Sequence, residues 1–207
     1  MQSAQGNGGT VSVSQETDRS YENLTGSYEG FFVVHDPLQP VNTADISTYV
    51  VVGSFAREQS PTNLMSETFM YDFNNGQIDS AFAYMGPHTD NLEAMITVQE
   101  LANGSSRVSV VLHNSMAGET YPTHAHDKKD PSTTPNNTPY DETPNTDVLV
   151  VMIEGNGGDA YGGQASPKSY QELTSTYEAF FVVHDPLQPV NTADPTTYVV
   201  LGNFARK

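Results

Sequence analysis

"YEAFFVVHDPLQPVNTADPTTYVVLGNFAR", residues Tyr177–Arg206, occurs almost unchanged at Tyr28–Arg57 as "YEGFFVVHDPLQPVNTADISTYVVVGSFAR". Both copies contain two short runs of aromatic and β-branched residues, separated by prolines, asparagine and aspartate. This pattern is typical of two strands joined by a loop. The sequence therefore predicts the same pair of strands twice. The copies differ at five of thirty positions: Gly30/Ala179, Ile46/Pro195, Ser47/Thr196, Val52/Leu201 and Ser54/Asn203.

The duplication continues upstream in the same register. "GNGG" at Gly6–Gly9 recurs at Gly155–Gly158, and "SYENLT" recurs as "SYQELT", again with an offset of 149 residues. A unit of this length is a domain, because short solenoid repeats have periods of about 20–50 residues. We therefore expect residues 1–58 to be a partial repeat, a copy of the C-terminal third of a domain, and residues 59–207 to form one complete domain.

The composition excludes several classes of protein. The chain is 36% hydrophobic, which is enough for a core, and its net charge of −17 argues against binding nucleic acid. It has no cysteine, which excludes disulfides and thiolate metal sites. No apolar run approaches the roughly 20 residues of a membrane span. Acidity, few lysines and polar loops favour an exported protein, in an extracellular, cell-surface or periplasmic location.

The rest of the chain also has the pattern of strands. Residues 92–115 predict a hairpin, with Val108, Val110 and Leu112 on one face of its second strand. Residues 67–85 predict another hairpin around an Asn-Gly turn. Residues 147–155, "DVLVVMIEG", predict a buried strand. Short strands with frequent turn signals indicate an all-β fold, an antiparallel β-sandwich or barrel.

Two segments depart from the strand pattern. "SYQELTSTY", residues 169–177, predicts one or two helical turns. Residues 126–146 have four prolines and almost no apolar side chain, which predicts a long structureless loop. Such a loop in a compact domain is usually functional or mobile.

The long loop follows "YPTHAHD", Tyr121–Asp127, which contains two of the six histidines. Residues two apart in a strand point to the same side, so His124 and His126 are expected on one face, where they suit a shared metal ion. An ordinary surface position beside a polar loop is the alternative. His184, at the end of the apolar run "FFVVHD", offers a third imidazole from another strand, or is a packed core histidine. Sites rich in histidine suit copper and zinc.

The order of these motifs resembles a known family. Over Leu92–Phe204 the chain resembles copper–zinc superoxide dismutase and the related CHRD domains. The elements that carry the resemblance are, in order, a hairpin, G-x-x-Y-P-x-H-x-H, a long polar loop, a strand ending in VVHD, an acidic loop and a last strand "TYVVLGNF". The resemblance implies an eight-stranded Greek-key β-sandwich. It also implies that His124, His126 and His184 are copper ligands, with one copper (or zinc) ion in each complete domain.

Other features implied by the resemblance are missing from the sequence. The loop after His126 has no bridging histidine, no zinc-site histidines are recognisable, and there is no disulfide. No arginine lies between VVHD and the last strand, since Arg206 follows that strand. We therefore expect weak or absent dismutase activity and assign no catalytic residue. The carboxylates in or beside the loop are Asp127, Asp130, Asp141 and Asp147.

The other histidines have weaker assignments. His113 is expected at the surface, or as a fourth metal ligand if its strand neighbours the His-x-His strand. His88, in "GPHTD", is expected in a turn. His35 is the repeat counterpart of His184, and its own copy has no His-x-His pair in this chain.

Two functions follow as hypotheses. The first is an exported, metal-binding superoxide dismutase-like domain, whose partner is the metal ion. The second is a structural module of a tandem-array adhesin or surface filament, with strand exchange between copies. Because a two-stranded piece is not stable alone in water, residues 1–58 are expected to pack on the complete domain, on a neighbouring repeat or in a homo-oligomer.

Overall fold

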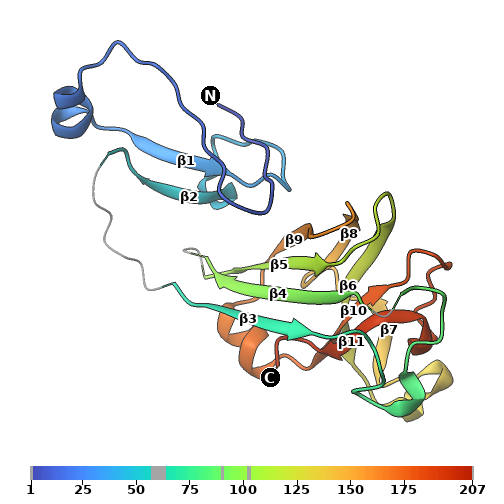
Figure 1. The fold of residues 1–207 in the computed structure, drawn as a ribbon. Coiled ribbons are helices and arrows are strands. Elements are labelled where there is room, and N and C mark those ends of the chain that lie inside the picture. Colours follow the sequence, from blue (N-terminus) through green and yellow to red (C-terminus); the bar gives the residue numbers. More distant parts are fainter. Residues whose placement is uncertain (1, 57–63, 90, 102–103, 207) are drawn as a thin grey trace. The chain divides into compact units, whose positions relative to one another are not determined.

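The computed structural model describes residues 2–56, 64–89, 91–101 and 104–206 (Figure 1). The chain divides into two compact units, Met1–Asn63 and Leu64–Lys207. The boundary predicted after residue 58 lies outside the described residues. Across the described residues, no helix has the length and apolar character needed to cross a membrane.

The smaller unit contains one antiparallel hairpin. Strand β1 (Phe31–His35) pairs with β2 (Tyr49–Ser54), and the register shifts by one residue just before His35. A π-helical turn, η1 (Asn23–Ser27), precedes the hairpin, and a 3-10 turn, η2 (Ile46–Thr48), leads into β2. Both strands that the sequence predicts here are therefore present.

The larger unit consists of two antiparallel sheets. One contains β3 (Ser66–Tyr71), β4 (Glu93–Glu100), β5 (Ser106–His113) and β9 (Ala160–Ser166), in that order. The second has the order β11-β10-β6-β7, and β8 also pairs with β6. Its strands are β6 (Thr120–Lys128), β7 (Tyr140–Pro144), β8 (Val150–Glu154), β10 (Ala179–His184) and β11 (Tyr198–Asn203).

Side chains from both sheets meet in one core, so the predicted all-β sandwich class is confirmed. In the predicted hairpin β4–β5, Val108, Val110 and Leu112 alternate with partly exposed residues and are almost fully buried. Phe181 and Val183 of β10 enter the same core from the other sheet. The described part of this unit has nine strands, whereas the family resemblance implies eight. The Greek-key order stays a prediction.

The predicted hairpin at residues 67–85 is wrong in its second half. After β3 the chain forms a 3-10 turn, η3 (Ser80–Phe82), in place of a returning strand. The side-chain amide of Asn74 donates to the carbonyl oxygens of Phe82 and Tyr198, at 2.8 and 3.0 Å. These bonds fold the segment across the start of β11, so tertiary contacts override the local turn signal.

The polar segment 126–146 is more regular than the predicted structureless loop. Strand β6 continues into it as far as Lys128, and β7 forms near its end. Between them lie the 3-10 turns η4 (Pro131–Thr133) and η5 (Pro135–Asn137), each with proline in its first turn. Asp130 accepts a hydrogen bond from the amide of Ser132 and so starts η4. Local turn chemistry thus orders a segment that has few apolar residues.

Two further expectations have mixed outcomes, and one strand was not expected. The helical turns predicted at residues 169–177 are present as η6 (Glu172–Thr176). Strand β8 forms, but it is half-exposed, since Ile153 is its one fully buried residue. Strand β9 has no counterpart in the sequence-based prediction. A side chain at Gly163 would lie 2.7 Å from the carbonyl oxygen of Val108, so close packing on β5 explains glycine in this strand.

A second, smaller core lies on the outer face of the five-stranded sheet. Phe180 and Val182 of β10 point into it, opposite to Phe181 and Val183, so both faces of β10 are buried. This explains the continuous apolar run "AFFVV" in place of an alternating pattern. The cluster comprises Tyr140, Phe180, Val182, Tyr198 and Leu201, with Ile78 and Phe82 packed against it, and η7 (Pro195–Thr197) leads into its strand β11.

Candidate metal centre

The pleat of β6 places its two histidines on the outer face of the five-stranded sheet. Tyr121 and Ala125 face the main core, so His124 and His126 share the opposite side. Strand β10 pairs with β6 so that Val182 lies across from His124. His184, two residues after Val182, therefore lies on the same face as the pair.

The three imidazoles form one buried cluster, which we call the triad: His124, His126 and His184. The ring centroid of His124 lies 4.7 Å from that of His126 and 4.8 Å from that of His184. One ring nitrogen from each residue can be chosen so that all three lie within 4.8 Å of one another. Two ligands of one ion are at most about 4.2 Å apart, because a metal–nitrogen bond is about 2.0–2.1 Å. The three nitrogens must therefore move closer together to bind one ion.

Each triad residue has one buried nitrogen with no hydrogen-bond partner among the described residues. These atoms are Nδ1 of His124, Nε2 of His126 and Nε2 of His184. Buried polar atoms are nearly always hydrogen-bonded, so three unpaired nitrogens in one cluster require an explanation. A shared cation bound by their lone pairs satisfies all three at once, and the residues present therefore fit a metal ion.

A hydrogen bond fixes the tautomer of His126. Its Nδ1 lies 2.6 Å from the carbonyl oxygen of Asp141, which can only accept, so Nδ1 carries the proton. The lone pair is then on Nε2, which is the unpaired atom. Metal-binding histidines commonly donate their other N–H to such a carbonyl, because the bond orients the ring.

Two tyrosine rings pack against the buried triad. The ring of Tyr140 lies 5.0 Å from that of His126, and the ring of Tyr198 lies edge-on to His184 at 4.6 Å. The hydroxyl of Tyr198 donates to the carbonyl oxygen of Thr192 at 3.0 Å, which holds that ring in place. The wall of the site is therefore formed by Tyr140, from segment 126–146, and by Tyr198, from strand β11.

Burial keeps the triad neutral at physiological pH. Desolvation, together with its two histidine neighbours, lowers the pKa of His124 to about 2. Desolvation and the neighbouring His126 lower the pKa of His184 to about 4. Desolvation also lowers the pKa of His126, against the opposing effect of the Asp141 carbonyl. Neutral imidazole is the form that binds a metal, so the site is ready to bind without first losing protons.

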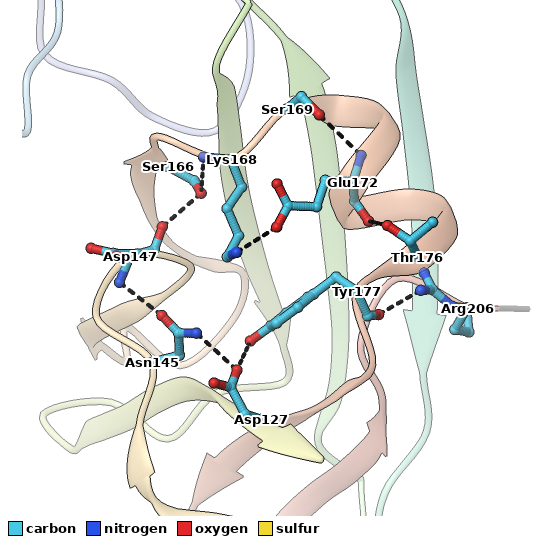
Figure 2. Close-up of polar contacts among 10 residues, drawn as sticks. All are labelled: Asp127, Asn145, Asp147, Ser166, Lys168, Ser169, Glu172, Thr176, Tyr177 and Arg206. Carbon is cyan, nitrogen blue, oxygen red and sulfur yellow. Dashed lines mark hydrogen bonds and ion pairs between the residues drawn. The ribbon is translucent and has the colours of Figure 1, made fainter.

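The carboxylates near the loop serve the fold, and none belongs to the triad. Figure 2 shows Asp127, whose carboxylate accepts hydrogen bonds from the Tyr177 hydroxyl at 2.5 Å and the Asn145 amide at 2.8 Å. These bonds tie the end of β6 to η6 and to the turn before β8. Asp141 pairs with Lys129, and Asp130 starts η4 as described above. The main chain of Asp147 bonds to Asn145 and Ser166.

The structure does not bring His113 into the triad. Its strand, β5, pairs with β4 and β9 and so belongs to the other sheet. Its Nδ1 lies 2.8 Å from the carboxylate of Asp159, in a partly exposed hydrogen bond. His113 is therefore partly exposed, in line with the surface position expected for it. The condition for a fourth ligand, that its strand adjoin the His-x-His strand, is not met.

His88 has a structural role beyond its predicted turn position. It is buried, with Nδ1 2.7 Å from the carbonyl oxygen of Thr89 and Nε2 2.9 Å from the hydroxyl of Tyr121. The turn sequence "GPHTD" gave no indication of this burial.

Arg206 is engaged away from the triad. Its guanidinium donates to the carbonyl oxygens of Leu173 and Tyr177, which anchors the chain after β11 to η6 (Figure 2). Across the described ranges, the one group of three or more potential metal-ligating residues is the triad. In comparisons with known proteins, no family model, curated protein or solved structure matches this chain.

Proposed function

We propose that the larger unit is a metal-binding domain that holds one copper or zinc ion through His124, His126 and His184. The observation that carries this proposal is the buried cluster of three imidazoles: each has one ring nitrogen without a hydrogen-bond partner among the described residues, and one nitrogen from each ring lies within 4.8 Å of the others. Three neutral imidazoles and no carboxylate form a donor set that suits copper or zinc better than calcium or magnesium. When bound, the ion supplies a Lewis-acidic centre and, if it is copper, a redox-active one.

We further propose that this unit is a superoxide dismutase-like domain of an exported protein and that its dismutase activity is weak or absent. The His-x-His and VVH motifs in order, on paired strands of a β-sandwich, support the likeness. The net charge of −17 repels an anionic substrate, and Arg206 is held by main-chain carbonyls. Binding and storage of a metal is therefore favoured over rapid turnover of superoxide.

A structural role is the second candidate. The observation that favours it is the near-identical hairpin sequence at both ends of the chain, which is expected of repeated modules in an adhesin or surface filament. The two roles are compatible, since a repeat unit can also bind a metal. The metal content of the purified protein distinguishes a metal-binding module from a structural module whose histidines are only packed in the fold.

Metal titration of the purified full chain tests the proposal. We expect about one Cu(II) or Zn(II) per chain by calorimetry and elemental analysis, and nitrogen coupling in the Cu(II) electron paramagnetic resonance spectrum. The double variant His124→Ala/His126→Ala should lose this binding. His113→Ala, which removes a histidine outside the triad, is the matched control and should bind like the wild type. Equal uptake by wild type and the double variant would refute the assignment.

A further inference from the structure

The hairpin β1–β2 has the same internal structure as β10–β11. In both hairpins the register shifts immediately before the histidine. The hydroxyl of Tyr49 donates to the carbonyl oxygen of Thr43 at 3.0 Å, and the hydroxyl of Tyr198 donates to that of Thr192 at the same distance. The N-terminal copy is therefore a formed hairpin that carries most of the same side chains, including the histidine and the tyrosine, in the same places.

The apolar side chains of the two hairpins differ sharply in exposure. Those of β10–β11 are buried on both faces, between the main core and the smaller outer core. Their counterparts in β1–β2 have no such cover within the smaller unit. The exposed fractions are 75% for Phe31, 53% for Phe32 and 53% for Val52, against 5% for Phe180, 0% for Phe181 and 3% for Leu201.

The larger unit itself shows what covers such a hairpin. Strand β6 pairs with one edge of β10, the main core receives Phe181, and Tyr140 packs on Phe180. We call this place in the body of the domain the hairpin slot. Among the described residues, β1 pairs with β2 alone, so the edge that corresponds to the β6-facing edge of β10 has no strand beside it. The slot therefore offers a complement to the open edge of β1 and to Phe31 and Phe32, the counterparts of Phe180 and Phe181.

We propose that β1–β2 is an alternative occupant of the hairpin slot, and that it enters this slot on a second copy of the chain. The slot holds β10–β11 in every copy of the chain, so the hairpin enters only where β10–β11 leaves, and a dimer or a folded monomer of the variant described below distinguishes entry between copies from entry within one chain. Entry displaces β10–β11 of the other copy. Since the two hairpins differ at five of thirty positions, their docking free energies are close, and exchange of near-identical elements is a low-cost route to association.

The exchange also supplies a metal ligand. The rings of His35 and Tyr49 meet edge-on with centroids 4.8 Å apart, as those of His184 and Tyr198 do at 4.6 Å. In the slot of a second copy, His35 takes the position of His184 beside the His-x-His pair. This part of the inference rests on the proposed metal site, whereas the docking itself does not.

Disabling the C-terminal hairpin in the full chain tests the exchange. In Phe181→Asp a carboxylate replaces a fully buried ring, so β10 can no longer occupy the slot. Each molecule then has one open slot and one intact hairpin, β1–β2. We expect a folded, reciprocally exchanged dimer by circular dichroism and light scattering. The matched variant Phe32→Asp should remain a folded monomer, and Phe181→Asp/Phe32→Asp should not fold.

Metal binding gives a separate measure. The dimer of Phe181→Asp should bind one Zn(II) per chain. Adding His35→Ala to this variant should weaken Zn(II) binding by at least about tenfold, and the dimer should not dissociate. His35→Ala alone should have no effect. An unfolded Phe181→Asp, or a folded monomer, would overturn exchange between copies. A dimer that binds no Zn(II), with a wild type that also binds none, would leave the exchange standing and overturn the proposed metal site.

Discussion

His124 and His184 lie on paired strands with ring centroids 4.8 Å apart, although sixty residues separate them in the sequence. Both are almost fully buried, and both have a pKa far below the ordinary value near 6.5, at about 2 for His124 and about 4 for His184. The β6–β10 pairing therefore holds two neutral bases side by side. This arrangement links the stability of the domain to pH.

The metal-free protein should lose stability as the pH falls below about 6.5. Between the folded and unfolded pKa values the unfolded state binds more protons, so stability rises with pH across that window and falls on acidification. Each histidine contributes up to about 1.4 kcal/mol per pH unit, so the two together remove about 4 kcal/mol between pH 7 and pH 5. Urea unfolding at the two pH values measures this loss.

The control for this prediction is His124→Gln/His184→Gln, which keeps polar side chains but removes both titrating groups. Its unfolding free energy should change much less between pH 7 and pH 5. If the wild type and the double variant have the same pH dependence, the buried imidazoles do not control acid stability.

A bound metal should stabilise the fold. An ion that binds the native state alone adds about 2.7 kcal/mol at a free concentration a hundred times its Kd, and more at higher concentrations. We expect Zn(II) to raise the midpoint of thermal unfolding at pH 7 and a chelator to reverse the shift. His126→Ala should abolish the shift, whereas His113→Ala should preserve it. A midpoint that does not respond to Zn(II) in the wild type would contradict metal binding by the folded state.

Tyr140 should control both stability and the release of metal. Its fully buried ring packs on His126, Phe180 and Tyr198, with centroids 5.0 to 5.9 Å away. Tyr140→Ala should cost about 3–5 kcal/mol, as other buried aromatic deletions do, and should open the triad to water. We expect faster transfer of Zn(II) to a chromophoric chelator in stopped flow. Tyr140→Phe keeps the ring and should release Zn(II) at the wild-type rate. If Tyr140→Ala also releases Zn(II) at the wild-type rate, Tyr140 does not shield the triad from water.

The strands of this fold were predictable wherever the residue pattern was periodic. Val108, Val110 and Leu112 alternate cleanly, and the run around Phe181 is apolar throughout, so both segments were predicted as strands and are strands. Strand β9 was not predictable. It contains glycine because β5 packs too close for a side chain, and no local sequence pattern reveals that contact. The turn after Asn74 was misread, because its side chain bonds to β11, more than a hundred residues away.

The triad was predictable in part. If residues 121–127 form a strand, the spacing of His124 and His126 places both side chains on one face of it. The VVH motif at the end of an apolar run indicates His184 as a third ligand. The tautomer-fixing bond from His126 to the Asp141 carbonyl was not predictable, because it depends on the path of the 126–146 segment. For His113 two positions stayed open, at the surface or as a fourth ligand, because the pairing of β5 with β4 and β9 is a long-range property that the local sequence does not reveal.

Superoxide turnover by the copper-loaded protein should be slow and should rise with salt. Superoxide is an anion, and the chain has a net charge of −17, so the long-range field repels the substrate. Raising the ionic strength from about 0.01 M to 0.15 M shortens the Debye length from about 30 Å to about 8 Å and weakens this repulsion. A dismutase that steers its substrate with positive charge has the opposite salt dependence.

Stopped-flow decay of superoxide at the two ionic strengths measures this effect. His124→Ala/His126→Ala, treated with the same copper, is the control for loosely bound metal and should be inactive at both. Because electrostatic steering alone is worth about 10–10³ in rate, we expect the copper-loaded wild type to fall well below the diffusional ceiling of about 10⁸–10⁹ M⁻¹s⁻¹. A rate near that ceiling that decreases with salt would show that a local positive field guides superoxide to the triad in spite of the net charge, and the domain would then be an efficient dismutase.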